Sequence, residues 1–283
     1  NTRTVQALST EAITALTTGQ IEVINTAGLA ALTTSQVKAL STDAVIALST
    51  YQVANLTTGT MAALSTAQVA AIETTDIQAL STKQLAGLAT GTVSALTTDQ
   101  VIALTTYQVG NLSTATLKAL SSDQIAAIET TDIQVLTTGQ LAGLATSTVA
   151  ALTTDQVVAL TTYQIGNLST ATLKALSSDQ LVAIETTDIQ ALKTSQLATL
   201  ATSTVAALST DQIQALLTSQ LGALGTNSVR ALTTDQVVAL TTDQVAQGLT
   251  TAQIVALTTG QVSSGLTTGQ IAALTTTQVA AIE

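Results

Sequence analysis

Leucine or isoleucine occupies every residue number divisible by eight from Leu8 to Leu240, without exception. Five residues after each of these positions, from Ile13 to Val245, lies a second apolar residue, which is aliphatic everywhere except at Met61. Such regular spacing is typical of a repeat array, in which each short unit packs against its neighbours. The chain is therefore expected to form a solenoid rather than an ordinary globular domain.

The octad consensus, Ala-Leu-Ser/Thr-Thr-x-Gln-Val/Ile-x, favours one very short helix in each repeat. In one clean copy, Thr153 has the position of an N-cap, and Gln156 follows at the spacing of a capping box. Leu152 and Val157 have the spacing of a hydrophobic staple around the same helix start. A single continuous α-helix is excluded, because eight residues overshoot two turns by about 80° and the leucines would wind around every face.

A β-solenoid is the alternative fold. Leu152 and Val157 are an odd number of residues apart, so they would face opposite sides of one strand unless the chain turned a corner in every octad. Corners need Gly, Asn, Asp or Pro at a fixed place, whereas the 15 glycines are scattered and proline is absent. We therefore predict an all-α solenoid. The second hydroxyl residue of each octad, from Thr10 to Thr242, is so uniform that we also expect a ladder of Thr side chains between coils.

A longer period of 56 residues, or seven octads, lies over the first. The residues that repeat with this period are Tyr51, Tyr107 and Tyr163; Asn55, Asn111 and Asn167; Glu73, Glu129 and Glu185; Asp76, Asp132 and Asp188; and Ala89, Ala145 and Ala201. One interpretation is the duplication of a 56-residue block. The other is geometric: seven octads complete two turns of about 3.5 octads each.

The pattern changes near the end of the chain. Octads are regular over residues 1–240, whereas residues 241–283 include two steps of nine residues, Leu240–Leu249 and Leu257–Leu266. We predict one regular solenoid over 1–240, followed by a joint or terminal cap over 241–283. Because the sequence begins at Asn1 and stops within the repeat pattern, we expect a processed chain or a window onto a longer one.

The chain has few of the residue types that form catalytic or metal-binding sites. The chain contains no His and no Cys, so it cannot build a serine or cysteine triad or a zinc site of the usual kind. A carboxylate pair for glycoside chemistry could come from Glu73 and Asp76. However, Glu73 has the cap position and Asp76 the Gln position, which favours a structural role for both. We predict no catalytic residue, cofactor or specific metal site; surface acids could bind calcium loosely.

The charge and hydropathy of the chain limit the classes of molecule that it is expected to bind. The net charge is −10 with only seven basic residues, which disfavours nucleic acid and anionic membrane surfaces. Thr or Ser interrupts every apolar stretch before it reaches the roughly 18 residues of a membrane span. The three tyrosines, Tyr51, Tyr107 and Tyr163, occupy a variable position at the predicted helix start. We expect them to be exposed and name them as a possible self-association surface.

Two resemblances bear on function. The segments 152–160 and 232–240 both read Leu-Thr-Thr-Asp-Gln-Val-Val-Ala-Leu, which resembles the opening of the repeat in TAL effectors. That resemblance covers only nine residues and lacks the base-reading loop, so it implies a helix start and not DNA binding. Over nearly the whole chain, the Thr-rich, Lys-poor, Cys-free octads resemble regions of very large secreted bacterial proteins described as adhesin-like, haemolysin-like or haem-utilisation proteins. This resemblance implies an extracellular structural role.

From the sequence we therefore expect an extracellular structural repeat protein, without enzymatic activity, that self-associates into a homopolymer. A filament, a surface layer or an adhesin stalk would fit. Two alternatives remain: a Thr array that binds ice or another surface, and a functional amyloid of the biofilm matrix.

Overall fold

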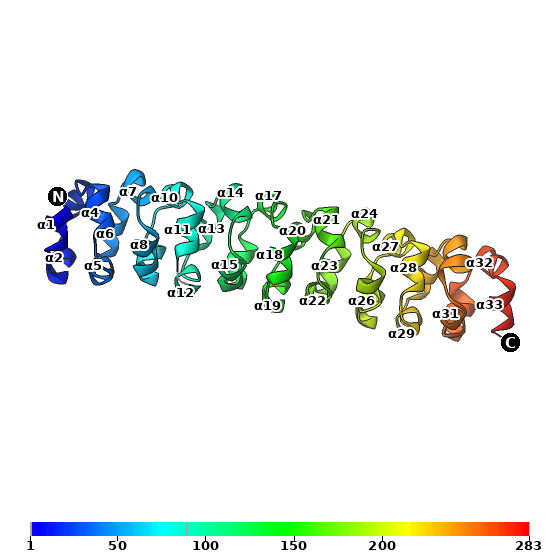
Figure 1. The fold of residues 1–283 in the computed structure, drawn as a ribbon. Coiled ribbons are helices and arrows are strands. Elements are labelled where there is room, and N and C mark those ends of the chain that lie inside the picture. The colour runs from blue at the N-terminus through cyan, green and yellow to red at the C-terminus, as the bar shows by residue number, and fades with distance from the viewer. Residues whose placement is uncertain (1, 89, 283) are drawn as a thin grey trace. The chain divides into compact units, whose positions relative to one another are not determined.

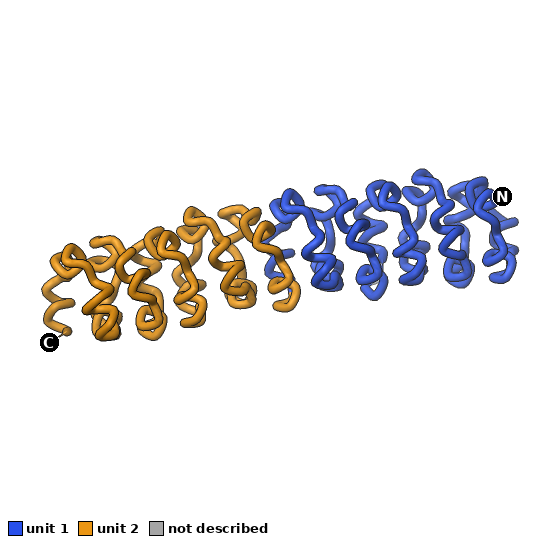
Figure 2. The backbone as a smooth tube through the Cα atoms, turned by 180° about the vertical axis from the view of Figure 1, so that it is seen from behind, with its two compact units in different colours: residues 1–144 blue, residues 145–283 orange. Residues whose placement is uncertain are grey.

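The computed structural model describes residues 2–88 and 90–282, so Ala89 of the 56-residue series lies outside the described residues. Helices are the only regular elements in these two ranges, which confirms the predicted all-α solenoid. The β-solenoid alternative is wrong, and the functional-amyloid alternative has no support here, because cross-β stacking needs strands. The chain forms two compact units, residues 1–144 and residues 145–283 (Figure 2).

In the first unit, each octad contributes one short helix, and successive helices wind into coils that stack side by side (Figure 1). Its helices are α1 (Thr2–Gln6), α2 (Thr10–Thr14), α3 (Thr18–Glu22), α4 (Thr26–Ala30), α5 (Thr34–Ala39), α6 (Thr42–Ile46), α7 (Thr50–Ala54), α8 (Thr58–Ala63), α9 (Thr66–Ala70), α10 (Thr74–Ala79), α11 (Thr82–Gly87), α12 (Thr90–Val93), α13 (Thr98–Ile102), α14 (Thr106–Gly110), α15 (Thr114–Ala119), α16 (Ser122–Ala126), α17 (Thr130–Ile133) and α18 (Thr138–Gly143).

The second unit is built in the same way. Its helices are α19 (Thr146–Ala150), α20 (Thr154–Val158), α21 (Thr162–Gly166), α22 (Thr170–Ala175), α23 (Ser178–Val182), α24 (Thr186–Ile189), α25 (Thr194–Leu197), α26 (Thr202–Ala207), α27 (Thr210–Ala215), α28 (Thr218–Gly222), α29 (Thr226–Arg230), α30 (Thr234–Ala239), η1 (Gln244–Gly248), α31 (Thr251–Val255), η2 (Gln261–Gly265), α32 (Thr268–Ala273) and α33 (Thr276–Ala280), where η marks a π-helix.

The capping box starts most of these helices, as predicted. Before α20, Thr153 has the extended backbone of an N-cap, with φ −73° and ψ 160°. The Thr153 hydroxyl accepts from the Gln156 backbone N–H at 3.1 Å, and the Thr153 N–H donates to the Gln156 side-chain oxygen at 2.9 Å. These two bonds satisfy donors that a helix start otherwise leaves unpaired. The helix ends at Val158, and three residues later Thr161 takes the extended backbone of the next N-cap.

The core is a thin interior of aliphatic side chains. From Ile13 to Ile254, the second apolar residue of each octad is no more than 2% exposed, and from Leu40 to Leu249 the leucine or isoleucine of each octad is no more than 9% exposed. Helices of four to six residues do not survive alone in water. Burial of such side chains, about 1.5–3 kcal/mol each, is what stabilises them once the coils stack.

A coil contains between three and four octads. Within each unit, most helices pack against the helix three repeats later, as α7 does with α10 and α8 with α11. Gln84 of α11 also reaches back to α7, because its amide lies 2.9 Å from the Val53 carbonyl oxygen, 31 residues earlier. Helices of one coil are thus staggered against those of the next. These contacts fit about 3.5 octads in each coil, or two coils for every seven octads. Residues 56 positions apart therefore lie at equivalent places two coils apart.

The two nine-residue steps form π-helical turns. In η1, the Leu249 N–H donates to the Gln244 carbonyl at 2.9 Å, five residues earlier, and in η2 the Leu266 N–H makes the same bond to Gln261. The extra residue is absorbed in these turns. Stacking continues through them, since η1 packs on α28 and η2 on α30. The predicted division at residue 240 stays a prediction.

Candidate assembly surfaces

Glutamine side chains join each coil to the one before it. The Gln108 side-chain oxygen accepts from the Thr105 N–H at 2.7 Å, completing the capping box. Its amide nitrogen donates to the carbonyl oxygens of Ile77 at 2.8 Å and Leu80 at 2.7 Å in the preceding coil. One buried amide, 3% exposed, therefore starts its own helix and binds the coil beneath it. We call this recurring arrangement the glutamine ladder.

The glutamine ladder runs through both units. Its members, each with an amide bonded to carbonyls of an earlier coil, are Gln36, Gln52, Gln68, Gln84, Gln100, Gln108, Gln124 and Gln140 in the first unit, and Gln180, Gln196, Gln212, Gln220, Gln236, Gln244, Gln253, Gln261, Gln270 and Gln278 in the second. The sequence does not indicate this second role of the glutamine, because capping alone accounts for its spacing from the N-cap residue.

The expected Thr ladder is wrong. Within residues 2–88 and 90–282, no hydrogen bond joins the second hydroxyl residues of different coils. These residues, such as Thr34 and Thr42, form the first position of each helix and are exposed. Thr50 does reach the next coil, but it bonds to the carboxyl group of Asp76. The uniform threonine therefore serves the helix start and the surface.

The two acids singled out from the sequence occupy helix-start positions. Glu73 is the N-cap of α10 and makes no side-chain cap bond, and Asp76 has the place of the ladder glutamine. Asp76 is only 2% exposed. Burial raises the pKa of Asp76, a bond from Thr50 opposes the rise, and the nearby Glu73 charge adds to it. Among the described residues, no three acidic side chains gather as a metal site; loose calcium binding stays a prediction.

Replacing Asp76 with Asn is expected to raise stability at neutral pH and to have a smaller benefit in acid. A carboxyl whose pKa is raised by folding contributes its full stability below its unfolded pKa and loses it as pH rises through the folded value. We expect less than about 1 kcal/mol, because the bond from Thr50 already offsets part of the cost of burying this carboxylate. Urea unfolding at pH 7 and pH 3 measures the difference. Asp99→Asn, at an exposed first-turn position, should instead be neutral or destabilising.

The three tyrosines lie on the surface, one at the start of α7, α14 and α21. Tyr51, Tyr107 and Tyr163 are 72–73% exposed. In each case an Asn four residues later donates to the tyrosine carbonyl, at 2.8 Å for Asn55. An exposed aliphatic residue precedes each tyrosine by five positions, namely Ile46, Ile102 and Val158. The structure places these residues at equivalent points of the 56-residue period, and their role in self-association stays a prediction.

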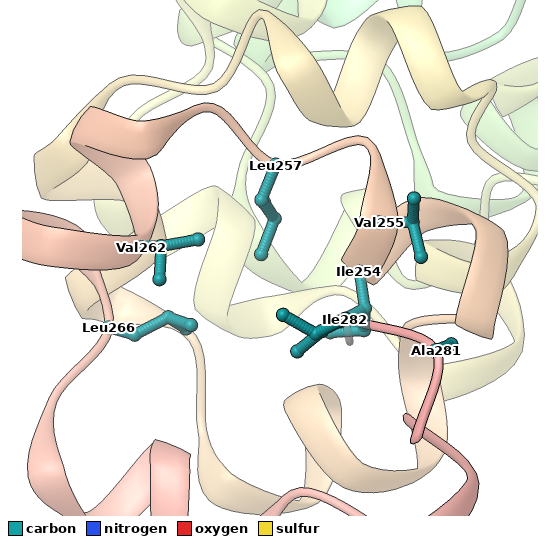
Figure 3. A pocket seen from close by; sticks show the side chains of 7 residues that line it. All are labelled: Ile254, Val255, Leu257, Val262, Leu266, Ala281 and Ile282. Atoms are coloured by element: carbon teal, nitrogen blue, oxygen red, sulfur yellow. The ribbon is translucent and has the colours of Figure 1, made fainter. Parts of the chain in front are cut away.

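The last coil of the second unit has an open apolar face. Ile271 and Val279 take the core position of their octads, yet each is 44% exposed. The second unit also has a pocket of about 110 Å³ lined by Ile254, Val255, Leu257, Val262, Leu266, Ala281 and Ile282. Leu257, Val262 and Leu266 point into this pocket from one side and Ile282 from the other (Figure 3). In earlier coils the same positions are covered by the coil that follows.

The first coil of the first unit has the opposite character. Ile13 and Ile21 are fully buried, because the second coil covers them. Its half-exposed apolar side chains come from the leucine positions, Leu8, Leu16, Ile24 and Leu32. Gln20 completes a capping box but is exposed, and its amide nitrogen meets no carbonyl of another coil. The two kinds of end face are therefore chemically different from each other.

Comparison with known families agrees with this architecture. Five segments match the ALTTAQ repeat: residues 21–58, 69–106, 125–162, 181–218 and 216–247, more than half of the chain. The chain belongs to the ALTTAQ repeat family. The second, third and fourth ALTTAQ matches begin at residues 69, 125 and 181, in steps of seven octads. No curated protein matches the chain. In the described residues, none of the helices has the length and apolar character to cross a membrane.

Proposed function

We propose that this ALTTAQ repeat chain is an extracellular structural protein that self-associates into a filament, a surface layer or an adhesin stalk. The observation that carries the proposal is the glutamine ladder: within each unit, the same short set of bonds recurs from one coil to the next, so a further coil can be joined by the same contacts. Open solenoid faces of this kind favour further stacking. The resemblance to secreted adhesin-like proteins supports an extracellular setting, and the net charge of −10 disfavours nucleic acid as a partner.

The tyrosines offer a second mode of association, side by side. Tyr51 and Tyr107 lie two coils apart in the first unit, which corresponds to about 16–20 Å if packed helices are 8–10 Å apart. Exposed aromatic residues are enriched in protein interfaces. Tyrosines at this spacing would give a lateral contact that recurs at every second coil, and a sheet-like surface layer requires such a regular contact.

Electron microscopy and light scattering of the purified chain test the proposal. We expect filaments or sheets whose mass grows with protein concentration. Monodisperse particles of single-chain mass at every concentration would contradict it. Surface labelling of intact source cells tests the extracellular setting, because a structural protein outside the cell must be accessible to a membrane-impermeant reagent.

Ice or surface binding remains a second candidate because the second hydroxyl residues, such as Thr34, Thr42 and Thr50, are exposed in successive octads. These residues are distributed around a coil of between three and four octads rather than along one flat face. Measurement of thermal hysteresis near freezing distinguishes this candidate from the filament proposal.

A further inference from the structure

We propose that the first unit pairs side by side with the first unit of a second copy of this chain, offset by one coil. Each tyrosine of one copy then lies over the smaller residue between the tyrosines of the other. This inference rests on the proposed self-association and specifies its lateral contact. The surfaces that meet lie on the side of the stack, so the contact does not involve the face of any coil.

Ladder bonds align residues that are 28 positions apart in neighbouring coils. The Gln52 amide donates to the Ile24 carbonyl, 28 residues earlier, at 2.7 Å. Tyr51 and Val23 directly precede these two residues, so they lie at the same place in adjacent coils. Extending this interval through the first unit gives one residue in each of five coils. They are Val23, Tyr51, Ala79, Tyr107 and Val135, and we call them the tyrosine row.

Contacts between helices of the first unit support the rest of the tyrosine row. Tyr51 belongs to α7 and Ala79 to α10, and these two helices pack together. Tyr107 belongs to α14, and the Val135 Cγ2 lies only 3.3 Å from the place of a Cβ on Gly110 of the same helix. In Figure 1, α7, α10, α14 and α17 follow one another along one edge of this unit. The tyrosine row therefore runs along the stack.

The tyrosine row alternates between large and small side chains. Tyr51 and Tyr107 are 72–73% exposed, so their rings project from the surface. Ala79, in the coil between them, is half-buried and offers only a methyl group. The residues beyond the tyrosines, Val23 and Val135, are exposed and aliphatic. The surface is therefore lower at Ala79 than at the tyrosines, which are about 16–20 Å apart if packed helices are 8–10 Å apart.

A second copy of this chain has the spacing that fits this surface. In both copies the coil sets the interval between tyrosines, so an offset of one coil brings several rings over aliphatic side chains at once. Burial of a tyrosine ring against aliphatic carbon removes apolar surface from water and leaves the hydroxyl at the edge of the contact. Two rows that are not offset would instead place ring over ring and leave Ala79 facing Ala79 across a gap.

Charge also favours a like copy at the tyrosine row. The chain has a net charge of −10, so most surfaces of two copies repel each other. No Asp, Glu, Lys or Arg lies within five residues of Tyr51 or Tyr107. The exposed charges nearest to the other row members in the sequence are Glu22, beside Val23, and Lys83, four residues after Ala79, and they have opposite signs. Asp76 and Asp132 are buried inside their coils.

Cysteine cross-linking of the full chain tests the offset, because the chain has no cysteine of its own. An offset of one coil brings Ala79 of one copy next to a tyrosine of the other. Ala79→Cys mixed with Tyr51→Cys, or with Tyr107→Cys, is expected to give disulfide-linked dimers under mild oxidation, whereas Ala79→Cys alone should give none. Efficient cross-linking of Ala79→Cys with itself would contradict the offset.

The matched control is Ala119→Cys, mixed with the same tyrosine variants. Ala119 is the last residue of α15 as Ala79 is of α10, and both are half-buried. However, Ala119 lies 12 residues, or 1.5 octads, after Tyr107, which is nearly half-way around a coil of about 3.5 octads. Cross-links no more frequent with Ala79→Cys than with Ala119→Cys would overturn the contact.

Sedimentation velocity of uncross-linked variants provides a second test. The double variant Tyr51→Ser, Tyr107→Ser should weaken association at least about ten-fold, as loss of buried aromatic anchors does in other interfaces. Ala79→Trp should weaken it as well, because the indole occupies the space that a partner ring needs, and Ala119→Trp should not. Far-UV circular dichroism checks that each variant keeps its helices, and the double variant decides the test if Ala79→Trp does not.

The outcomes separate this contact from the wider proposal. Association that the double variant leaves unchanged would overturn the tyrosine row while leaving self-association through another surface. An unmodified chain that keeps single-chain mass at every concentration would overturn both.

Discussion

Replacement of Gln108 with Met is expected to cost about 2–4 kcal/mol of folding free energy. Met has a similar size, but it removes the donor to the Ile77 and Leu80 carbonyls and the acceptor for the Thr105 N–H. Each buried polar group left without its partner costs about 1–3 kcal/mol. Urea unfolding of the full chain, followed by far-UV circular dichroism, measures the loss.

The chain contains its own control for this change. Gln20 has the same capping box as Gln108 but makes no bond to another coil, because it lies in the first one. Gln20→Met should cost only about 1 kcal/mol, as expected for a helix cap. The difference between the two variants isolates the bond between coils. Equal costs for the two would show that the ladder contributes nothing beyond capping.

A peptide of residues 97–128 is expected to have no stable helix in water. It spans four octads and thus about one coil, α13 to α16, with every capping signal intact. Helix nucleation is unfavourable, and helices of five or six residues gain too little to offset it. Without coils on either side, the core side chains of the peptide stay in water, and the ladder glutamines have no carbonyls to bind.

Far-UV circular dichroism of the peptide beside the full chain provides the measurement. The full chain should give a helical spectrum, and the peptide a spectrum of an unordered chain. A peptide with the same helical signal per residue would mean that capping and staple contacts suffice locally, which would contradict the dependence on neighbouring coils.

Local structure was predictable from the sequence because its signals are local. Thr153 and Gln156 define a helix start through contacts within three residues, and the structure reproduces both of their bonds. Leu152 and Val157, the predicted staple pair, are both buried. The eight-residue spacing of the leucines fits neither one long helix nor one extended strand. Short helices, one in each octad, were therefore the predicted structure. The seven-octad period allowed two interpretations, block duplication and two turns of about 3.5 octads, and the contacts between coils fit the second.

The contacts between coils were not predictable in the same way. Gln108 and Leu80 are 28 residues apart, and no local signal shows that an amide already used in capping also binds a distant carbonyl. The uniform Thr of each octad suggested the wrong residue for that role. The π-helical turns at Leu249 and Leu266 were also missed, since a nine-residue step can be absorbed in several ways. The open pocket depends on which coil lies at the face of the stack, which is a tertiary property.

The glutamine ladder has a mechanical consequence. Its bonds join one coil to the next, so tension along a stack would load the coils in series and release them one after another. A released coil holds about 28 residues, which extend to roughly 90–100 Å at 3.3–3.6 Å per residue. Each coil occupies only about 10 Å of the stack while folded. A material made of such chains would lengthen several-fold under load and absorb work as it did so, without breaking a covalent bond.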